Sequence, residues 1–93
     1  MNQENAETIA LEVLQFIVAD ESEMSALTAQ TGMEPDDLRV GASDPNVLGA
    51  LLDFLLSDER RTVAFCEAFS MEPELPGRAR LALPGATAGI WEG

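Results

Sequence analysis

Histidine, lysine and tyrosine are absent from this 93-residue sequence, and cysteine occurs once, as Cys66. Without histidine the chain has no imidazole base and no serine–histidine or cysteine–histidine pair. Without lysine it has neither a Schiff-base amine nor the cation of a phosphate-binding loop, and no glycine-rich loop of that type occurs. One thiol without histidine also provides no zinc or haem ligand set. We therefore expect no catalytic residues, no cofactor and no metal site, and we expect that the chain is not an enzyme.

Long apolar stretches are missing as well. No wholly apolar run exceeds four residues, whereas a membrane span needs about 20. Residues 1–10 are acidic and polar, unlike the cationic and then apolar start of a signal peptide. A single cysteine cannot form an internal disulfide. These features predict a cytoplasmic protein with no membrane partner.

Positive charge is scarce. Five arginines face 17 carboxylates, which gives a net charge of −12. Such a surface repels the phosphates of nucleic acids and anionic lipids, and it attracts basic proteins. We therefore expect a protein partner, basic in character, and no nucleic acid.

The sequence contains two similar segments, residues 14–35 and 52–73. They align without a gap and share eight identities, where about two are expected by chance. The identities include Phe16 with Phe54, Asp20 with Asp58, and "MEP" in both copies. A repeat of this length is one supersecondary unit, too small to bury its own apolar face, but two copies can bury each other. The pattern predicts two helical-hairpin units, at about 6–41 and 45–82.

The expected fold class is all-α, a compact bundle of five to six short helices. In the first unit the pattern predicts helices over 6–19, with Asn5 as N-cap, over 21–31 and over 35–41. In the second unit it predicts a helix that begins at Pro45 after the N-cap Asp44, then helices over 59–69 and 73–82. The first helix of each unit is apolar nearly all round, so we expect the two to pack together at the centre. Residues 1–85 should form one domain, and residues 86–93 a flexible C-terminal tail.

The corners between helices have their own signals. Asp20 and Asp58 should each cap the following helix, and Glu23 should complete a capping box with Asp20. Gly32 suits a left-handed helix end, whereas its counterpart Ser70 would be strained there. The apolar spacing predicts that the 59–69 helix buries Val63, Phe65, Cys66 and Phe69. An outward polar stripe is expected at Asn46, Gly49, Asp53 and Ser57.

Residues 25–40 resemble a helix-turn-helix motif. The second helix of that motif would be the recognition helix, and it would open with Glu34, Asp36 and Asp37. These carboxylates would face phosphates and base edges rich in acceptors. We therefore expect no DNA binding.

The sequence favours a non-enzymatic protein-interaction module, either an adaptor or a homodimer. One alternative is an acidic mimic of nucleic acid that occupies a basic protein. The other is weak divalent-cation binding, between Asp20 and Asp58 or at residues 34–37, or an enzyme that uses only Asp, Glu and Arg. The candidate partner surface consists of exposed acids and one tryptophan: Glu34, Asp36, Asp37, Glu72, Glu74 and Trp91.

Several stretches also resemble a known family. They are "FIVAD", "TGMEPDDLR", "DPNVLGALLDFLLSDE" and "EPELPGRARLALPG". Together they look like a small family of alphaproteobacterial proteins of similar length, described only as a domain of unknown function, and the match spans roughly residues 9–85. The resemblance implies an all-helical cytoplasmic protein. It implies no catalytic or binding residues.

Overall fold

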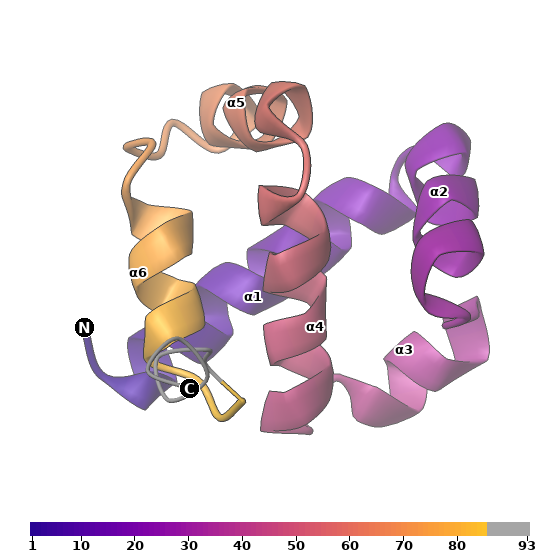
Figure 1. Cartoon of the computed structure of the whole chain (residues 1–93), viewed down its shortest axis with the longest axis horizontal. Helices are drawn as coiled ribbons and strands as arrows, with labels where there is room; N and C mark the ends of the chain where they lie inside the picture. Colours follow the sequence, from indigo (N-terminus) through magenta and orange to yellow (C-terminus); the bar gives the residue numbers. More distant parts are fainter. Residues whose placement is uncertain (86–93) are drawn as a thin grey trace, which may run out of the picture.

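The computed structural model describes residues 1–85, and in that range the chain forms six α-helices without strands (Figure 1). The helices are α1 (Gln3–Val18), α2 (Glu21–Thr31), α3 (Pro35–Gly41), α4 (Pro45–Leu56), α5 (Glu59–Ala68) and α6 (Leu75–Leu81). The predicted all-α bundle is confirmed. The predicted flexible tail, with Trp91, lies outside the described residues.

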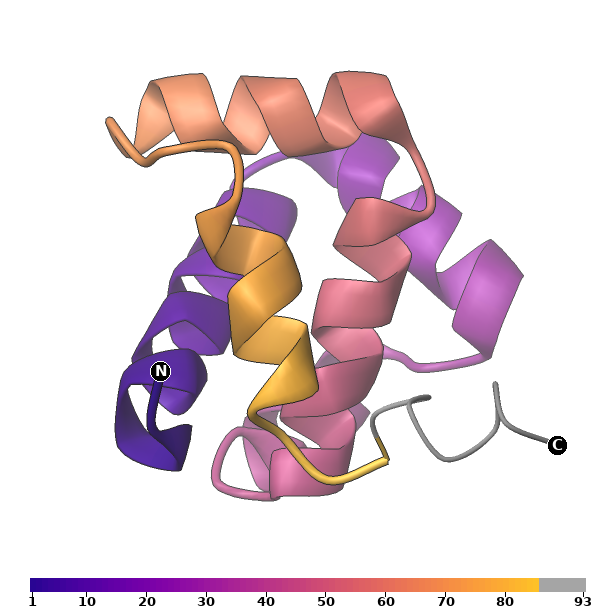
Figure 2. The same ribbon diagram turned by 60° about the vertical axis from the view of Figure 1, so that its left-hand side comes forward.

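Helices α1 and α4 cross at the centre of the bundle, and α6 packs against both of them (Figures 1 and 2). This agrees with the expected central pair. Fully burying one Leu, Ile or Phe side chain contributes about 1.5–3 kcal/mol. The two helices supply most of the core, which contains Ala6, Ile9, Ala10, Val13 and Ile17 from α1 and Leu48, Leu51, Leu52, Phe54 and Leu55 from α4.

The N-terminus of α1 differs from the prediction. The helix begins at Gln3, because Asn2 is the N-cap and its Oδ1 accepts a hydrogen bond from the Asn5 N–H at 2.7 Å. The predicted start at residue 6 with Asn5 as cap is therefore wrong. The extra residues Gln3, Glu4 and Asn5 are exposed. Ala6, the expected first residue, lies in the first turns of the helix and is fully buried.

The corners at Asp20 and Asp58 are built alike, as predicted. Asp20 Oδ1 accepts from the N–H groups of Ser22 and Glu23 at 2.9 and 3.4 Å. Asp58 Oδ1 accepts from the corresponding N–H groups of α5, also at 2.9 and 3.4 Å. The hydrogen bond from the Ser22 hydroxyl and those from the two backbone amides lower the pKa of Asp20. Its stabilising effect is therefore present above its unfolded-state pKa and is lost as the pH falls through its folded pKa.

Two other expectations about helix ends are wrong. Glu23 does not complete a box with Asp20, because its carboxylate binds Arg61 of α5 instead. The last helix begins at Leu75 and not at residue 73. A turn precedes this helix, and in it the Leu75 N–H donates to the Glu72 carbonyl (3.1 Å). Pro76 lies in the first turn of α6.

Gly32 and Ser70 both adopt a left-handed backbone, with φ of 79° and 52°. Ser70 is the one non-glycine residue with positive φ in the described part of the chain. The C-terminal ends of α2 and α5 close with different hydrogen bonds, in keeping with the expectation that Ser70 would be strained in this backbone. The Gly32 N–H donates to the Thr28 carbonyl (2.8 Å), whereas after Ser70 the Met71 N–H reaches back to the Cys66 carbonyl (2.8 Å).

This difference gives a prediction about stability. Ser70→Gly should raise the free energy of unfolding by about 0.5–1 kcal/mol, because the strain of the left-handed serine exceeds the entropy cost of glycine. Gly32→Ala should lower it by about 1 kcal/mol. No atom lies within 4 Å of where the new Cβ would be, so the loss comes from the backbone alone. Urea denaturation measures both changes. A destabilised Ser70→Gly variant would contradict the prediction.

Candidate functional site

The acidic residues expected to form a partner surface are placed in two groups. Glu34, Asp36 and Asp37 are exposed at the start of α3. Glu72 and Glu74 are exposed in the turn before α6. Helices α3 and α6 lie on opposite sides of α4 (Figure 1), so the two groups do not share one face, and Trp91 is outside the described residues.

A groove lies between α1 and α3 and encloses about 390 Å³. It is largely apolar, and Arg39 is the one charged residue in its lining. The α1 positions are spaced three, four and seven residues apart, which places them on one face of the helix. The groove is lined by Leu11, Leu14, Gln15 and Val18 of α1 and by Pro35, Leu38 and Arg39 of α3.

The open face of α1 corrects an expectation from the sequence. Leu11 is 41% exposed and Val18 is 54% exposed, although α1 was expected to be buried nearly all round. The reason is the position of α3, which packs on α4 and contributes its buried Leu38 to the core. On the other side of the bundle α6 packs on both central helices. This leaves one stripe of α1 uncovered beside α3.

Carboxylates flank the apolar lining along the chain. Glu12 follows Leu11, and Glu34, Asp36 and Asp37 adjoin Pro35 and Leu38. Asp36 pairs with Arg39, and Asp37 Oδ2 accepts from the Glu34 N–H at 2.9 Å. Of these acids, Glu34, Asp36 and Asp37 are exposed at the start of α3, the helix that forms one wall of the groove.

An ion pair connects α2 and α5. Arg61 Nε lies 2.6 Å from Glu23 Oε1, and the two side chains are 11% and 22% exposed. The Arg61 guanidinium also lies over the Phe54 ring, 4.0 Å from its centre. Glu23 and Arg61 are 38 residues apart, which is the offset between the two similar segments. The alignment places these opposite charges at matched positions, and this signal could have revealed the contact.

A second ion pair anchors α6 to α4. Arg80 Nε lies 2.6 Å from Asp53 Oδ1. The same guanidinium donates to the carbonyl groups of Pro84 and Gly85, at 3.1 and 2.8 Å. It covers Gly49 so closely that a Cβ there would lie 3.1 Å from Arg80 Nη1. Gly49 is therefore buried, and its place in the expected outward stripe is wrong.

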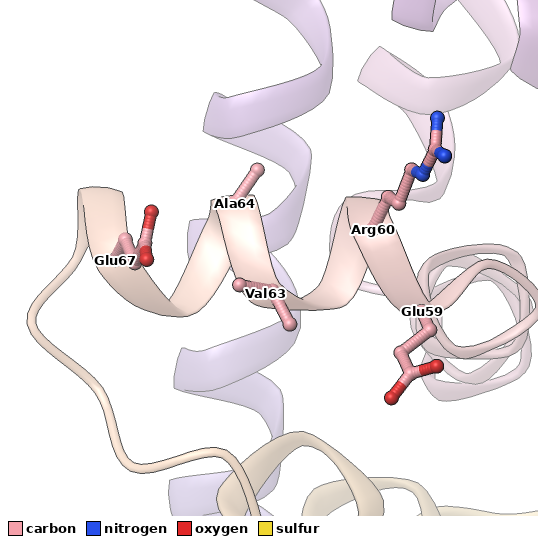
Figure 3. Close-up of a pocket in the computed structure, with 5 residues that line it drawn as sticks. All are labelled: Glu59, Arg60, Val63, Ala64 and Glu67. Carbon is pink, nitrogen blue, oxygen red and sulfur yellow. The ribbon is translucent and has the colours of Figure 1, made fainter.

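The outer face of α5 carries a shallow hollow of about 380 Å³. Figure 3 shows that its lining comes from this helix alone. Val63, which lies in the hollow, is 47% exposed, so the expectation that it faces inward is wrong. The inward face is filled by Phe65 and Phe69, whose ring centres are 4.9 Å apart. The hollow is lined by Glu59, Arg60, Val63, Ala64 and Glu67.

Cys66 is buried, with 5% of its surface exposed, as expected for a small core residue. Its thiol lies 3.9 Å from the Glu72 carbonyl oxygen. Burial raises the pKa of Cys66, and the negative charge of Glu74 raises it further. This environment disfavours the reactive thiolate.

Neither a metal cluster nor a membrane helix is found in residues 1–85. No three cysteine, aspartate or glutamate side chains of this range are grouped so that they could hold a metal ion. None of its helices is long and apolar enough to cross a bilayer. Asp20 and Asp58 each cap a different helix.

Comparison with known proteins gives one match. Residues 3–86 match the sequence model of a family described as "Protein of unknown function (DUF3572)". The chain belongs to the DUF3572 family. This confirms the resemblance to a domain of unknown function and leaves the function of the protein unknown. No curated protein and no solved structure matches the chain.

The partly buried ion pair of this DUF3572 domain should be energetically coupled. A double-mutant cycle with Glu23→Gln and Arg61→Met should give a coupling of about 1–3 kcal/mol, because both charges are largely removed from water. The matched control is the Asp36–Arg39 pair, whose side chains are 83% and 77% exposed. A cycle there should give less than about 0.5 kcal/mol. Equal coupling in the two cycles, measured by urea denaturation, would contradict this ranking.

The thiol of the DUF3572 domain should react slowly. Alkylation of Cys66 by iodoacetamide at pH 8 should be at least about tenfold slower in the folded chain than in the chain unfolded by urea. Burial both shields the sulfur and raises its pKa. Mass spectrometry of timed samples measures the two rates. Similar rates would show that the sulfur is accessible and the assignment as a core residue is wrong.

Proposed function

We propose that this chain is a non-enzymatic protein-interaction module that receives a partner protein in the groove between α1 and α3. The observation that carries the proposal is the uncovered apolar stripe of α1, formed by Leu11, Leu14 and Val18 beside Pro35 of α3. Single exposed apolar residues are common on protein surfaces, but a contiguous apolar groove is typical of an interaction site.

The physical chemistry of the groove supports this role. Burying its exposed leucine and valine side chains would contribute about 25 cal/mol for each Å² removed from water. The groove is formed by two helices whose positions are fixed by the core, so binding requires little ordering of the chain. The sequence lacks histidine and lysine, which supports the proposal that the module acts by binding and not by catalysis.

A different protein is a better partner than a second copy. Two copies of this chain would bring together two net charges of −12, and this repulsion opposes self-association. We therefore propose an adaptor role before a homodimer. A cytoplasmic location is part of the proposal, and a free, buried Cys66 is in keeping with a reducing compartment.

The acidic mimic of nucleic acid is a second candidate, supported by the 17 carboxylates. A mimic would bind through charge spread over the surface, so its affinity would depend steeply on salt and little on the groove. The groove proposal predicts the reverse, an affinity that depends strongly on the apolar contacts of the groove and little on salt. The two candidates therefore separate in one set of variants.

Capture from cells of the source organism tests the proposal with three baits. The full-length wild type and Val63→Asp, which changes an exposed valine of α5, should retain the same partner. Val18→Asp should reduce its recovery at least about tenfold, because a charge placed in an apolar contact is desolvated on binding. Circular dichroism checks that all three baits are folded.

The captured partner is then purified and bound to the wild type. Hydrogen exchange should show protection in α1 and α3 and none in α5. Loss of the partner in both valine variants, or protection confined to another face, would overturn the proposal. A partner that ignores Val18→Asp but dissociates in high salt would support the mimic instead.

A further inference from the structure

We infer that the occupant of the α1–α3 groove is a short amphipathic helix whose polar face carries arginine or lysine. This inference rests on the proposed function, because it names the partner class for the same groove. The α1 stripe from Leu11 to Val18 spans eight residues, a rise of about 10 Å along the helix. Two turns of a partner helix, with apolar residues three, four and seven positions apart, would cover it.

The fold itself contains an example of such a docking. Helix α6 is a short segment whose Pro76 and Ala79 are buried against the central helices. Its Arg80 stays at the edge, lies across α4 and pairs with Asp53 at 2.6 Å. A short helix with an apolar face and an edge arginine is therefore a ligand that this bundle already accommodates.

The proposed repeat relates that docking to the groove. With the same offset of 38, Leu11, Leu14, Gln15 and Val18 of α1 match Gly49, Leu52, Asp53 and Leu56 of α4. Arg80 covers Gly49 and Asp53 of this set. In the proposed repeat, the α1 positions that line the groove thus correspond to a set of α4 positions of which two, Gly49 and Asp53, contact α6. In the first unit α3 packs on α4 and leaves this face open.

Charge favours a basic polar face on the incoming helix. Gln15 of α1 aligns with Asp53 of α4, so the α1 face has no carboxylate at this position. A cation of the partner would therefore pair with a carboxylate at the edge of the groove. The acids at the start of α3, Glu34, Asp36 and Asp37, are exposed and lie beside the lining residues Pro35 and Leu38. The one lining cation, Arg39, is paired with Asp36. Basic side chains at these edges would form charge-assisted contacts and would lower the repulsion of the −12 chain.

A helix also fits better than an extended peptide. An extended peptide gains affinity mainly by adding a strand to a sheet edge, and residues 1–85 contain no strand. The groove walls are helix faces, whose ridges suit another helix.

Designed peptides bound to the full-length chain test the inference. The probe is a fluorescent peptide of about 18 residues, long enough to form a helix in isolation. It has leucine on one face and arginine on the other. Its matched control keeps the leucine face and replaces each arginine by glutamate. Fluorescence anisotropy should show binding of the arginine peptide at least about tenfold tighter than that of the glutamate peptide.

Variants of the chain locate the site. Val18→Asp should weaken the arginine peptide at least about tenfold, while Val63→Asp should leave it unchanged. Glu34→Gln with Asp37→Asn should weaken it about threefold to tenfold and reduce its salt dependence. The control pair Glu59→Gln with Glu67→Gln removes two equal charges from the exposed face of α5 and should have a smaller effect than the groove pair.

Each contrary result is informative. If both peptides bound in the groove with equal affinity, the inference that the partner helix is basic would be overturned, while the proposed function would stand. Binding that survives Val18→Asp and vanishes in high salt would reveal general charge attraction and overturn the inference. No binding of either peptide would also overturn it, while the capture experiment judges the proposed function separately. A dimer of the chain alone that Val18→Asp dissociates would assign the groove to a second copy.

Discussion

The burial of α1 against α4 is the interaction on which the positions of the other helices depend. More than half of the residues of each of these helices are apolar, and a single helix can bury such residues only against another element. Once the two cross, the chain must turn sharply at Asp20 and Asp58, where a carboxylate closes the start of the next helix. The positions of α2 and α5 therefore follow from these two corners, whereas α6 packs beside the crossing of α1 and α4.

Charge is arranged around this core in an uneven way. Within residues 1–85, three of the five arginines form ion pairs, with Asp36, Glu23 and Asp53. Two of these pairs are partly shielded from water and join helices distant in sequence. Most carboxylates remain in solvent, where they favour solubility and raise the affinity for cations of other molecules. Two of the scarce cations therefore connect helices that the apolar core has brought together, and most of the negative charge faces solvent.

Much of the fold could be predicted from the residues. Asp44 before Pro45 marks the start of α4, and Asp20 and Gly32 bound α2, because caps and left-handed ends depend on local chemistry. The start of α1 could not be predicted in this way, since Asn2 and Asn5 are equally good caps and the local sequence does not choose between them. Val63 and Gly49 were placed wrongly for a different reason. Their exposure depends on which neighbours, Phe65 and Arg80, occupy the space.

The candidate groove was the least predictable feature. The apolar pattern of α1 indicated burial on all sides, and only the seating of α3 on α4 leaves Leu11 and Val18 in contact with solvent. The acids at the start of α3 were expected to contact a partner, but nothing in the sequence showed that an apolar stripe lies beside them. That juxtaposition joins residues 16 or more positions apart, which local patterns do not report.

The contact between Glu23 and Arg61 has a consequence for how the two halves of the chain relate to each other. Glu23 and Arg61 occupy matched positions of the two similar segments, so two copies of the same segment placed in this arrangement would oppose like with like. Glutamate against glutamate, or arginine against arginine, would repel in this shielded place. The opposite signs make each half complementary to the other and incompatible with a duplicate of itself. Exchange of one half between two molecules keeps the contact between Glu23 and Arg61. Pairing of two first halves, or of two second halves, brings like charges together and is disfavoured.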